Sequence, residues 1–389
     1  MNYWPDSKCE ENSFYLYDID LAKSEITEIL KSKPDFLKIF FATKANPLSS
    51  FLKLFNELGI NIDVASSGEL HQATKCGFDS SKIITTGPAK SKPYLKKFLE
   101  SGVKIFVIES PQQLIELNEL SANYQNIEVL LRVQLEWKEG ESVLGGNNIT
   151  PFGISMDDWK KINFSNFNNI KIIGLHTFQW GNILKKKELF NIWEEAIKKL
   201  VTFSKNMNIK LDVIDLGGGL GVPYHNQECD YGINEVYSNL KILKEKYNLK
   251  KIWVEWGRFL TGKYGYFFSK IIDIKQVRAK EIIVIDGGLN HFARAALTDE
   301  YFPCNSKNEG NRKYSIHGPL CTGLDYHGTF ELDENLKVGD WLCFSNTGAY
   351  GFTESMPYFL CHQTAAEKII QNSKIITVRK SVEASEYLV

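Results

Sequence analysis

Short apolar runs alternate with amphipathic stretches from about residue 36 to residue 257. Eight of the apolar runs have strand character, and most are followed by a stretch with helical periodicity: residues 37–43, 61–66, 82–87, 104–110, 127–133, 169–178, 211–217 and 251–257. Strands that alternate with helices indicate a parallel sheet, and eight such units predict a (β/α)8 barrel. An open doubly wound sheet is the competing architecture, but it usually has fewer repeats and opens on a G-x-G-x-x-G turn, which is absent here.

The pattern changes after about residue 265. The later segments "YGYFFSKIIDIKQV", "EIIVIDGG", "KYSIHGPL", "DWLCFSN" and "KIITVRKS" are short, rich in strand-forming residues and separated by turns. They predict a β domain of sandwich or small-barrel type, which "SFYLYD" near the N-terminus is expected to join. We therefore expect a barrel over residues 25–265, and a β domain over 1–24 and 266–389 that contributes to a dimer and to the active site.

Charge and cysteine content exclude several classes of function. Lys and Arg number 46 against 47 Asp and Glu, so no basic excess points to nucleic acid. The first residues have no signal-peptide core and no apolar run is long enough to span a bilayer, so we expect a cytoplasmic protein. Seven widely spaced cysteines without a C-x-x-C pair suggest neither a disulfide framework nor a metal site.

Polar residues gather where the predicted barrel strands end. The first strand ends in "FFATKAN", which places Lys44 at its tip, and comparable positions on later strands hold Asp63, Arg132, His176, the triplet Gly217, Gly218 and Gly219, and Glu255 to Arg258. Each residue alone has an ordinary structural explanation, such as a strand-end lysine that meets water. Their joint occurrence at one end of six strands is more informative, because active sites of such barrels form there and buried charge is costly.

These residue types suit the chemistry of pyridoxal phosphate (PLP). A lysine amine forms a Schiff base with the cofactor aldehyde, and a carboxylate keeps the pyridine nitrogen protonated. Glycine N–H groups and an arginine bind a phosphate. Barrels often bind phosphate after strands seven and eight, where the glycine triplet and Arg258 lie.

The chain also resembles a known family. "FFATKAN", "GLH", "DLGGGLGVPY", "VEWGR", "PLCTGLD" and "NTGAYG" are similar, in order, to motifs of the fold-type III PLP-dependent decarboxylases, which include diaminopimelate and ornithine decarboxylases. The resemblance runs from about residue 14 to 365. It implies a PLP barrel followed by a β domain, and a homodimer with shared active sites that acts on a small molecule.

The resemblance also implies roles for individual residues. Lys44 would be the Schiff-base lysine, Glu255 would face the pyridine nitrogen, and Asp63 and Arg132 would organise the cofactor's surroundings. Cys321 would be the acid that reprotonates Cα, and it would reach the site from the partner subunit together with Asp325. The phosphate would be held by Gly217, Gly218, Gly219, Gly257, Arg258 and Tyr350.

Three departures from the family pattern bear on the pocket. Trp256 replaces the usual proline, and Phe178 occupies the place of the histidine that stacks on the cofactor ring, unless His176 approaches the ring instead. Thr322 follows Cys321 where diaminopimelate enzymes carry a glutamate, which disfavours diaminopimelate as substrate. The stretch "CTGLD", together with "NTGAYG", resembles that of a siderophore and antibiotic-pathway subgroup whose members act on citrate-linked or carrier-bound amino acids.

The substrate and some alternative activities stay open at this point. A citrate arm would want cations or hydrogen-bond donors, and Arg294 and His291 are candidates, whereas Asp325 would suit the distal amine of ornithine or lysine. The distal pocket is predicted from Tyr224, His291, Arg294, Asp325 and Phe352. A PLP-dependent racemase, a non-enzymatic PLP carrier and an inactive regulator are the alternatives to a decarboxylase.

Overall fold

The computed structural model describes residues 3–6, 9–137, 141–142, 145–146 and 149–388. The chain forms two compact units. Ile26–Gly221 and Cys229–Gly257 make up the barrel unit, and Met1–Glu25, Val222–Glu228 and Arg258–Val389 make up the β unit.

The barrel unit is a closed parallel barrel of eight strands. The sheet order β2-β3-β4-β5-β6-β10-β11-β12 closes because β12 also pairs with β2 and β10 with β6. All eight strands lie where the sequence predicts them, so the barrel is confirmed. They are β2 (Leu37–Ala42), β3 (Asn61–Val64), β4 (Ile83–Thr85), β5 (Ile105–Ile108), β6 (Glu128–Gln134), β10 (Lys171–His176), β11 (Val213–Asp215) and β12 (Lys251–Glu255).

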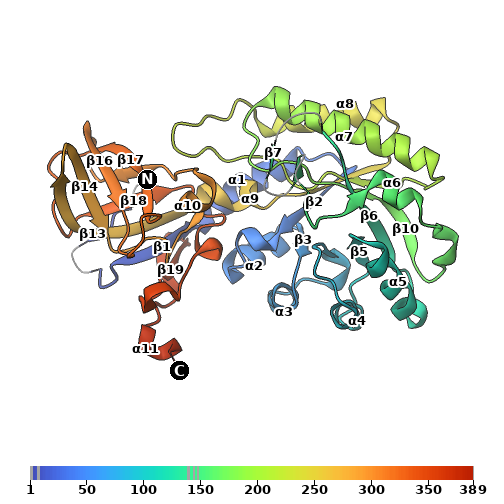
Figure 1. Ribbon diagram of the computed structural model, residues 1–389, viewed down its shortest axis with the longest axis horizontal. Helices are drawn as coiled ribbons and strands as arrows, with labels where there is room; N and C mark the ends of the chain where they lie inside the picture. Colours follow the sequence, from blue (N-terminus) through green and yellow to red (C-terminus); the bar gives the residue numbers. More distant parts are fainter. Residues whose placement is uncertain (1–2, 7–8, 138–140, 143–144, 147–148, 389) are drawn as a thin grey trace. The chain divides into compact units, whose positions relative to one another are not determined.

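Helices cover the outside of this barrel (Figure 1). They are α1 (Ile19–Lys31), α2 (Ser49–Glu57), α3 (Ser67–Lys75), α4 (Lys92–Glu100), α5 (Pro111–Leu120), α6 (Met156–Lys160), α7 (Lys186–Asn206) and α8 (Ile233–Lys246). Their ends follow local sequence signals. Ser110 caps α5 by accepting the N–H of Gln113, with Pro111 at the first helical position, and Gly77 after α3 adopts φ +87°.

Apolar side chains fill the barrel interior. A buried cluster takes residues from seven of the eight strands: Phe40, Ile84, Ile105, Val107, Leu130, Ile173, Val213 and Trp253. Because the interior is filled with side chains, no channel runs through the barrel. Polar, reactive groups can therefore lie only at the ends of the strands. Three short strands accompany it, namely β7 (Glu141–Ser142), β8 (Gly145–Gly146) and β9 (Ile154–Ser155), of which β9 extends the sheet beside β6.

The β unit is built on a mixed sheet of nine strands. The long strand β13 (Gly265–Val277) pairs through its first half with β1 (Ser13–Asp18) and β18 (Trp341–Ser345), and through its second half with β14 (Lys280–Ile285). The sheet also contains β15 (Cys304–Ser306), β16 (Arg312–His317), β17 (Tyr326–Leu332), β19 (Ala366–Gln371) and β20 (Lys374–Arg379). The unit has three short helices, α9 (Arg258–Thr261), α10 (Arg294–Thr298) and α11 (Ala384–Tyr387). The later segments thus form a mixed-sheet domain, and the N-terminal strand β1 pairs within that sheet.

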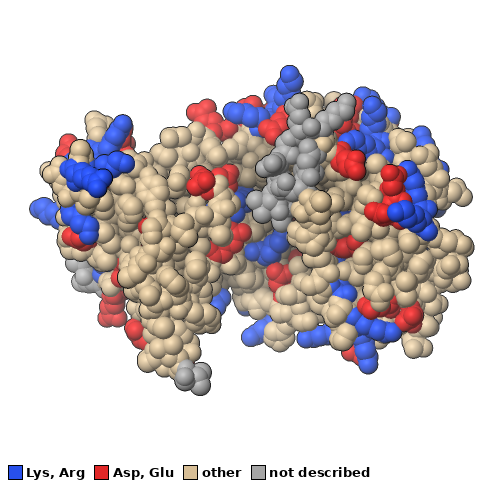
Figure 2. All heavy atoms as spheres, viewed as in Figure 1, with Lys and Arg blue, Asp and Glu red and all other residues tan. Residues whose placement is uncertain are grey.

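The surface carries both signs of charge. Figure 2 shows Lys and Arg side chains interspersed with Asp and Glu on the visible face. Among the residues that the structure describes, no helix has the length and apolar character needed to cross a bilayer.

Candidate active site

Lys44 lies in a single 3-10 turn, Thr43–Ala45, that follows β2 directly, and its side chain is exposed. The turn is anchored to the next strand because the Thr43 hydroxyl donates a hydrogen bond of 2.8 Å to the backbone oxygen of Asp63. The strand-end lysine therefore has a fixed backbone and an accessible amine, as a residue that must react with a small molecule requires.

Strand register brings Arg132, His176 and Asp215 side by side. His176 on β10 pairs with Arg132 on β6 and with Asp215 on β11. All three side chains are buried at the carboxyl ends of their strands. Glu255 ends the next strand, β12, so four ionisable groups share this end of the barrel.

His176 and Glu255 are in direct contact. Nε2 of His176 lies 3.2 Å from Oε1 of Glu255. Burial, with the nearby Arg132 charge, lowers the pKa of His176 well below its ordinary value, so the ring is neutral. Burial raises the pKa of Glu255, while Lys44 and Arg132 oppose that shift. The contact is therefore one between a neutral ring and a carboxyl group, and its geometry is not that of a hydrogen bond.

Two further carboxyl groups lie nearby. Burial and the Glu255 charge raise the pKa of Asp63 to about 7, although Thr86 donates a hydrogen bond of 2.8 Å to its Oδ1. Burial raises the pKa of Asp215 well above its ordinary value, and its Oδ1 accepts the N–H of Gly217. Neighbouring carboxylates in one buried site repel one another, so these carboxyl groups are not all ionised at the same time.

One group of ligand atoms could hold a cation or the polar edge of an organic molecule. Within the described ranges, one ligand atom from each of His176, Asp215 and Glu255 lies within 4.8 Å of the other two. Several of their polar atoms have no hydrogen-bond partner there, namely both His176 nitrogens, Oδ2 of Asp215 and Oε1 of Glu255. Buried polar atoms without hydrogen-bond partners are rare in folded proteins, so this group of atoms is a candidate ligand-binding site.

The glycine triplet after β11 packs against Phe178. A Cβ on Gly217, whose φ is +63°, would lie 2.8 Å from Cδ2 of Phe178, and one on Gly218 would lie 3.1 Å from Cε2. On the adjacent strand end, a Cβ on Gly257 would lie 2.9 Å from the Cβ of Ala45. Only glycine lets this backbone approach its neighbours so closely. Phe178 is half-buried beside the loop, whereas His176 is fully buried beside Glu255.

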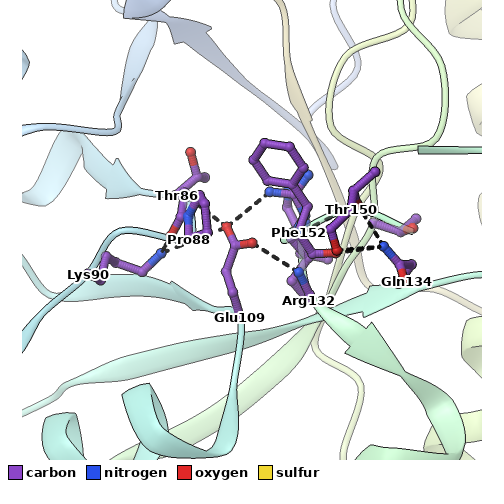
Figure 3. Close-up of polar contacts among 12 residues, drawn as sticks. Thr86, Pro88, Lys90, Glu109, Arg132, Gln134, Thr150 and Phe152 are labelled. Carbon is purple, nitrogen blue, oxygen red and sulfur yellow. Dashed lines mark hydrogen bonds and ion pairs between the residues drawn. The ribbon is translucent and has the colours of Figure 1, made fainter. Parts of the chain in front are cut away.

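Two further charged residues lie beside Arg132 at this end of the barrel, Lys90 and Glu109, and neither was predicted from the sequence. Glu109 directly follows β5, and its Oε1 accepts a hydrogen bond of 3.0 Å from Nη1 of Arg132 (Figure 3). Lys90 lies in the loop after β4, with Nζ 3.8 Å from the same oxygen. Glu109 could have been predicted in the same way as Arg132, because it is a charged residue at the end of an apolar strand. Lys90 lies further into the loop after its strand, and no sequence pattern points to it.

Within the β unit, Arg258 and Arg294 share two tyrosines. The Arg258 guanidinium lies 4.7 Å from the ring centre of Tyr350, and that of Arg294 lies 5.4 Å from it. Both also lie over Tyr224, whose hydroxyl accepts a hydrogen bond from Arg258. Burial and the neighbouring Arg294 lower the pKa of Arg258 to about 10, so it stays charged at neutral pH. Nη1 of Arg294 pairs with Glu354 at 2.9 Å and Nη2 with Glu300 at 3.1 Å.

The other predicted residues of the β unit differ in exposure. Cys321 is exposed on the loop before β17. Asp325 is buried, and its carboxylate accepts backbone N–H groups of Leu289 and Leu320 and a contact of 3.0 Å with Nε2 of His327. These contacts give Asp325 a structural task in holding the Cys321 loop. His291 is buried, and its Nε2 lies 2.9 Å from the backbone oxygen of Gln363.

Comparison with known proteins identifies the family. The profile described as "Pyridoxal-dependent decarboxylase, pyridoxal binding domain" matches residues 22–262, more than half of the chain. The chain belongs to the pyridoxal-dependent decarboxylases. It is a lyase whose cofactor is PLP, and the alternatives of a racemase and of a non-enzymatic PLP carrier are set aside.

Relatives of this decarboxylase include enzymes with different substrates. It is 29% identical to a diaminopimelate decarboxylase of Aquifex aeolicus, over 96% of this chain and 90% of that protein. It is 27% identical to an L-glutamyl-[BtrI acyl-carrier protein] decarboxylase of Niallia circulans, over 97% of this chain and 92% of that protein.

Solved structures share the fold. The diaminopimelate decarboxylase of Helicobacter pylori complexed with L-lysine has a TM-score of 0.84 at 21% identity, with 97% of this chain and 96% of that chain covered. A structure of an SrLDC mutant in complex with PLP has a TM-score of 0.80 at 21% identity, with 95% and 96% covered. At such identities the likeness concerns the fold.

The residues of the barrel unit fit PLP. Oε1 of Glu255 has no hydrogen-bond partner and offers an acceptor for a pyridine N–H. The chain turns tightly at Gly217 and Gly218, where an added Cβ would press against Phe178. The amine of Lys44 is exposed, as binding to the cofactor requires. When bound, PLP supplies an electron sink that stabilises negative charge at the substrate's Cα.

Proposed function

We propose that this decarboxylase removes the α-carboxyl group of an amino acid that carries a further group at the end of its side chain. A citrate-linked diamino acid of siderophore biosynthesis is the proposed example. The observation that carries the proposal is Thr322, which follows Cys321 where the resembling diaminopimelate enzymes have a glutamate. The Thr322 hydroxyl accepts the N–H of Leu324 at 3.3 Å, so it belongs to its own loop. With Thr322 in place of that glutamate, the distal ammonium group of diaminopimelate would have no carboxylate here to neutralise its charge.

The relatives support two kinds of substrate. The enzyme of Niallia circulans is named for a carrier-bound glutamyl group, which is a conjugated amino acid. The enzyme of Aquifex aeolicus is named for free diaminopimelate. Their identities to this chain are nearly equal, so the free amino acids ornithine, lysine and diaminopimelate form the second candidate class.

The barrel residues would share the work around the cofactor. Lys44 would hold the cofactor through its aldehyde carbon. Glu255, beside the neutral His176, would hold a proton at the pyridine nitrogen. The loop of Gly217, Gly218 and Gly219 would lie against the phosphate, with Gly257, Arg258 and Tyr350 as further phosphate residues. Phe178, beside that loop, would pack against the ring face.

The distal pocket is proposed around Arg294. Its guanidinium lies over the rings of Tyr224 and Tyr350, which suits a carboxylate-rich arm. Since Arg294 already pairs with Glu300 and Glu354, a substrate carboxylate would have to take the place of one of them. Burial lowers the pKa of His291, so this residue would contribute hydrogen bonds rather than charge. The buried contacts of Asp325 disfavour it as the reader of a distal amine.

A homodimer is part of the proposal. Cys321 would donate the proton to Cα in the active site of the other subunit, and its exposed position on a loop supports such a role. The β unit also exposes large apolar side chains, among them Met356 at 45%, Tyr358 at 70% and Leu360 at 46%. Exposed apolar residues close together in sequence are typical of an interface.

A mass-spectrometric screen of the purified, PLP-loaded protein tests the substrate class. The panel sets free ornithine, lysine and diaminopimelate beside citryl-ornithine and citryl-diaminopropionate, and the readout is the loss of one carboxyl group. Turnover of only the citryl compounds supports the proposal. Turnover of a free diamino acid at a higher kcat/KM overturns it and places the enzyme in lysine or polyamine metabolism.

A further inference from the structure

Lys90 is a buried lysine that the proposed function does not use. Its side chain is 1% exposed, and Nζ donates a hydrogen bond to the backbone oxygen of Gly87. Lysine is almost never fully buried unless it is paired, because removing the charge from water is costly. Its partner is Glu109, whose Oε1 lies 3.8 Å away.

Glu109 joins the ends of three neighbouring strands. Its Oε1 accepts the N–H of Gly87 at 2.7 Å, in the loop after β4, and Nη1 of Arg132 at 3.0 Å, on β6. Its Oε2 accepts the N–H of Gly153 at 3.0 Å, just before β9. Glu109 itself follows β5, so a single carboxylate ties together the ends of β4, β5 and β6 (Figure 3).

The contacts of Glu109 fix the guanidinium of Arg132. Glu109 holds one edge of it, and the ring of Phe152 lies 4.6 Å from the guanidinium carbon. The pairing of β6 with β10 places Arg132 next to His176, which contacts Glu255. The position of the Arg132 charge therefore bears on the groups that would face the cofactor.

The charges of Lys90, Glu109 and Arg132 do not cancel. Two cations face one carboxylate, and burial, which by itself raises the pKa of Glu109, is outweighed by Arg132 and Lys90, so its pKa is lowered. Glu109 stays ionised, so the trio itself carries a net positive charge, which faces the carboxyl groups of Asp63 and Glu255. An anionic cofactor would be attracted by that charge, which water would screen weakly at such depth.

We propose that Lys90 and Glu109 are positioning residues that hold Arg132 at the cofactor end of the barrel, and that Lys90 supplies the charge that makes the trio positive. This inference rests on the proposed cofactor site. It predicts that removing either residue weakens the binding of a pyridoxal-type phosphate, beyond any effect on folding.

The test uses pyridoxine 5′-phosphate, which has an alcohol in place of the aldehyde and cannot bond to Lys44. Its affinity for the full-length, cofactor-free protein is measured by equilibrium dialysis. We expect Lys90→Met to weaken binding about 3- to 10-fold. Glu109→Gln makes the trio more positive, but it should weaken binding about 10-fold or more because the Arg132 guanidinium loses the charged acceptor that positions it. Lys92→Met, which removes an exposed pair of 2.7 Å with Glu119, is the matched control and should leave the affinity unchanged.

The pH dependence of this affinity separates positioning from a simple structural role. Burial lowers the pKa of Lys90 to about 8; the Arg132 charge lowers it further, while Glu109, Asp63 and Glu255 oppose the shift. Wild-type affinity for pyridoxine 5′-phosphate should therefore fall as the pH rises through about 8. In Lys90→Met, the decrease in affinity near pH 8 should be absent.

A second variant tests whether Glu109 acts through Arg132. In an Arg132→Met background, adding Glu109→Gln should change the affinity less than about twofold, because the residue to be positioned is gone. Equal affinities of wild type, Lys90→Met and Glu109→Gln would overturn the inference, even if the variants melt at lower temperature. If wild type itself does not bind pyridoxine 5′-phosphate, the proposed cofactor site fails instead. Should Glu109→Gln not fold, Lys90→Met and its pH profile still decide.

Discussion

Nε2 of His176 lies 3.2 Å from Oε1 of Glu255, and both side chains are buried at the carboxyl ends of β10 and β12, the strands on either side of β11. The histidine ring is neutral because burial and the Arg132 charge lower its pKa. A neutral neighbour leaves the negative charge of Glu255 available to a third group, and the unpartnered Oε1 has room for one hydrogen bond. We expect this third group to be the pyridine nitrogen of PLP.

Glu255→Gln should therefore lower kcat about 100-fold or more, because an amide cannot hold a proton on the pyridine nitrogen. The side chain keeps its shape, so PLP content should stay close to that of the wild type. The measurement is kcat together with the PLP released per chain in alkali. A kcat within about threefold of the wild type would remove Glu255 from this role.

Lys44→Ala should abolish turnover, because the exposed amine after β2 is the group proposed to bind the cofactor aldehyde. Borohydride reduction of the loaded wild type should add the mass of one reduced cofactor per chain, and the variant should show no addition. Lys53→Ala, which removes an exposed lysine of α2, is the control and should behave as the wild type. Covalent labelling that persists in Lys44→Ala would assign the aldehyde to another amine.

Asp63→Asn should stabilise the cofactor-free protein at high pH. The pKa of Asp63 is about 7 in the folded chain against 3.8 ordinarily, so the folded state binds more protons and stability falls as the pH rises toward 7. The variant lacks this cost, so its stability relative to wild type should be about 1–2 kcal/mol higher at pH 8 than at pH 5.5. Urea unfolding at both pH values measures it. Asp35→Asn, at an exposed position, is the control. If the free energy of unfolding of Asp63→Asn differed from that of the wild type by the same amount at both pH values, the raised pKa of Asp63 would be contradicted.

The sequence was sufficient to predict the barrel because its strands and helices have different periods and their order is regular. It did not reveal β17 or β19, since "YHGTFEL" has an internal glycine and "AEKIIQ" lacks strict alternation. The site was predictable where a charged residue ends an apolar strand, as at Lys44 or Arg132. It was not predictable at Lys90, because only the folded loop after β4 brings that amine to Glu109. In the same way, the buried contacts of Asp325 could not be read from a motif.

Gly217→Ala should weaken PLP binding about tenfold or more. An added Cβ would lie 2.8 Å from Cδ2 of Phe178, and the residue adopts φ +63°, so the loop must move. Gly59→Ala is the matched control, because Gly59 adopts φ +75° with nothing within 4 Å of the added Cβ. Both variants should lose stability from the backbone strain, but only Gly217→Ala should lose PLP affinity in a dialysis titration. Phe178→Ala combined with Gly217→Ala should relieve the clash, and equal affinity losses in the two glycine variants would show that strain alone is responsible.

Mixed subunits test whether Cys321 serves the partner's active site. Lys44→Ala and Cys321→Ala should each be nearly inactive as pure dimers. If each site combines Lys44 of one subunit with Cys321 of the other, a mixed dimer has one site with both residues and one with neither. Random mixing of equal amounts should therefore restore about a quarter of the wild-type activity. The measurement is decarboxylation before and after the two variants are unfolded and refolded together, with light scattering to establish the dimer. Sites built within one subunit would give no recovery, because every site would then lack one of the two residues.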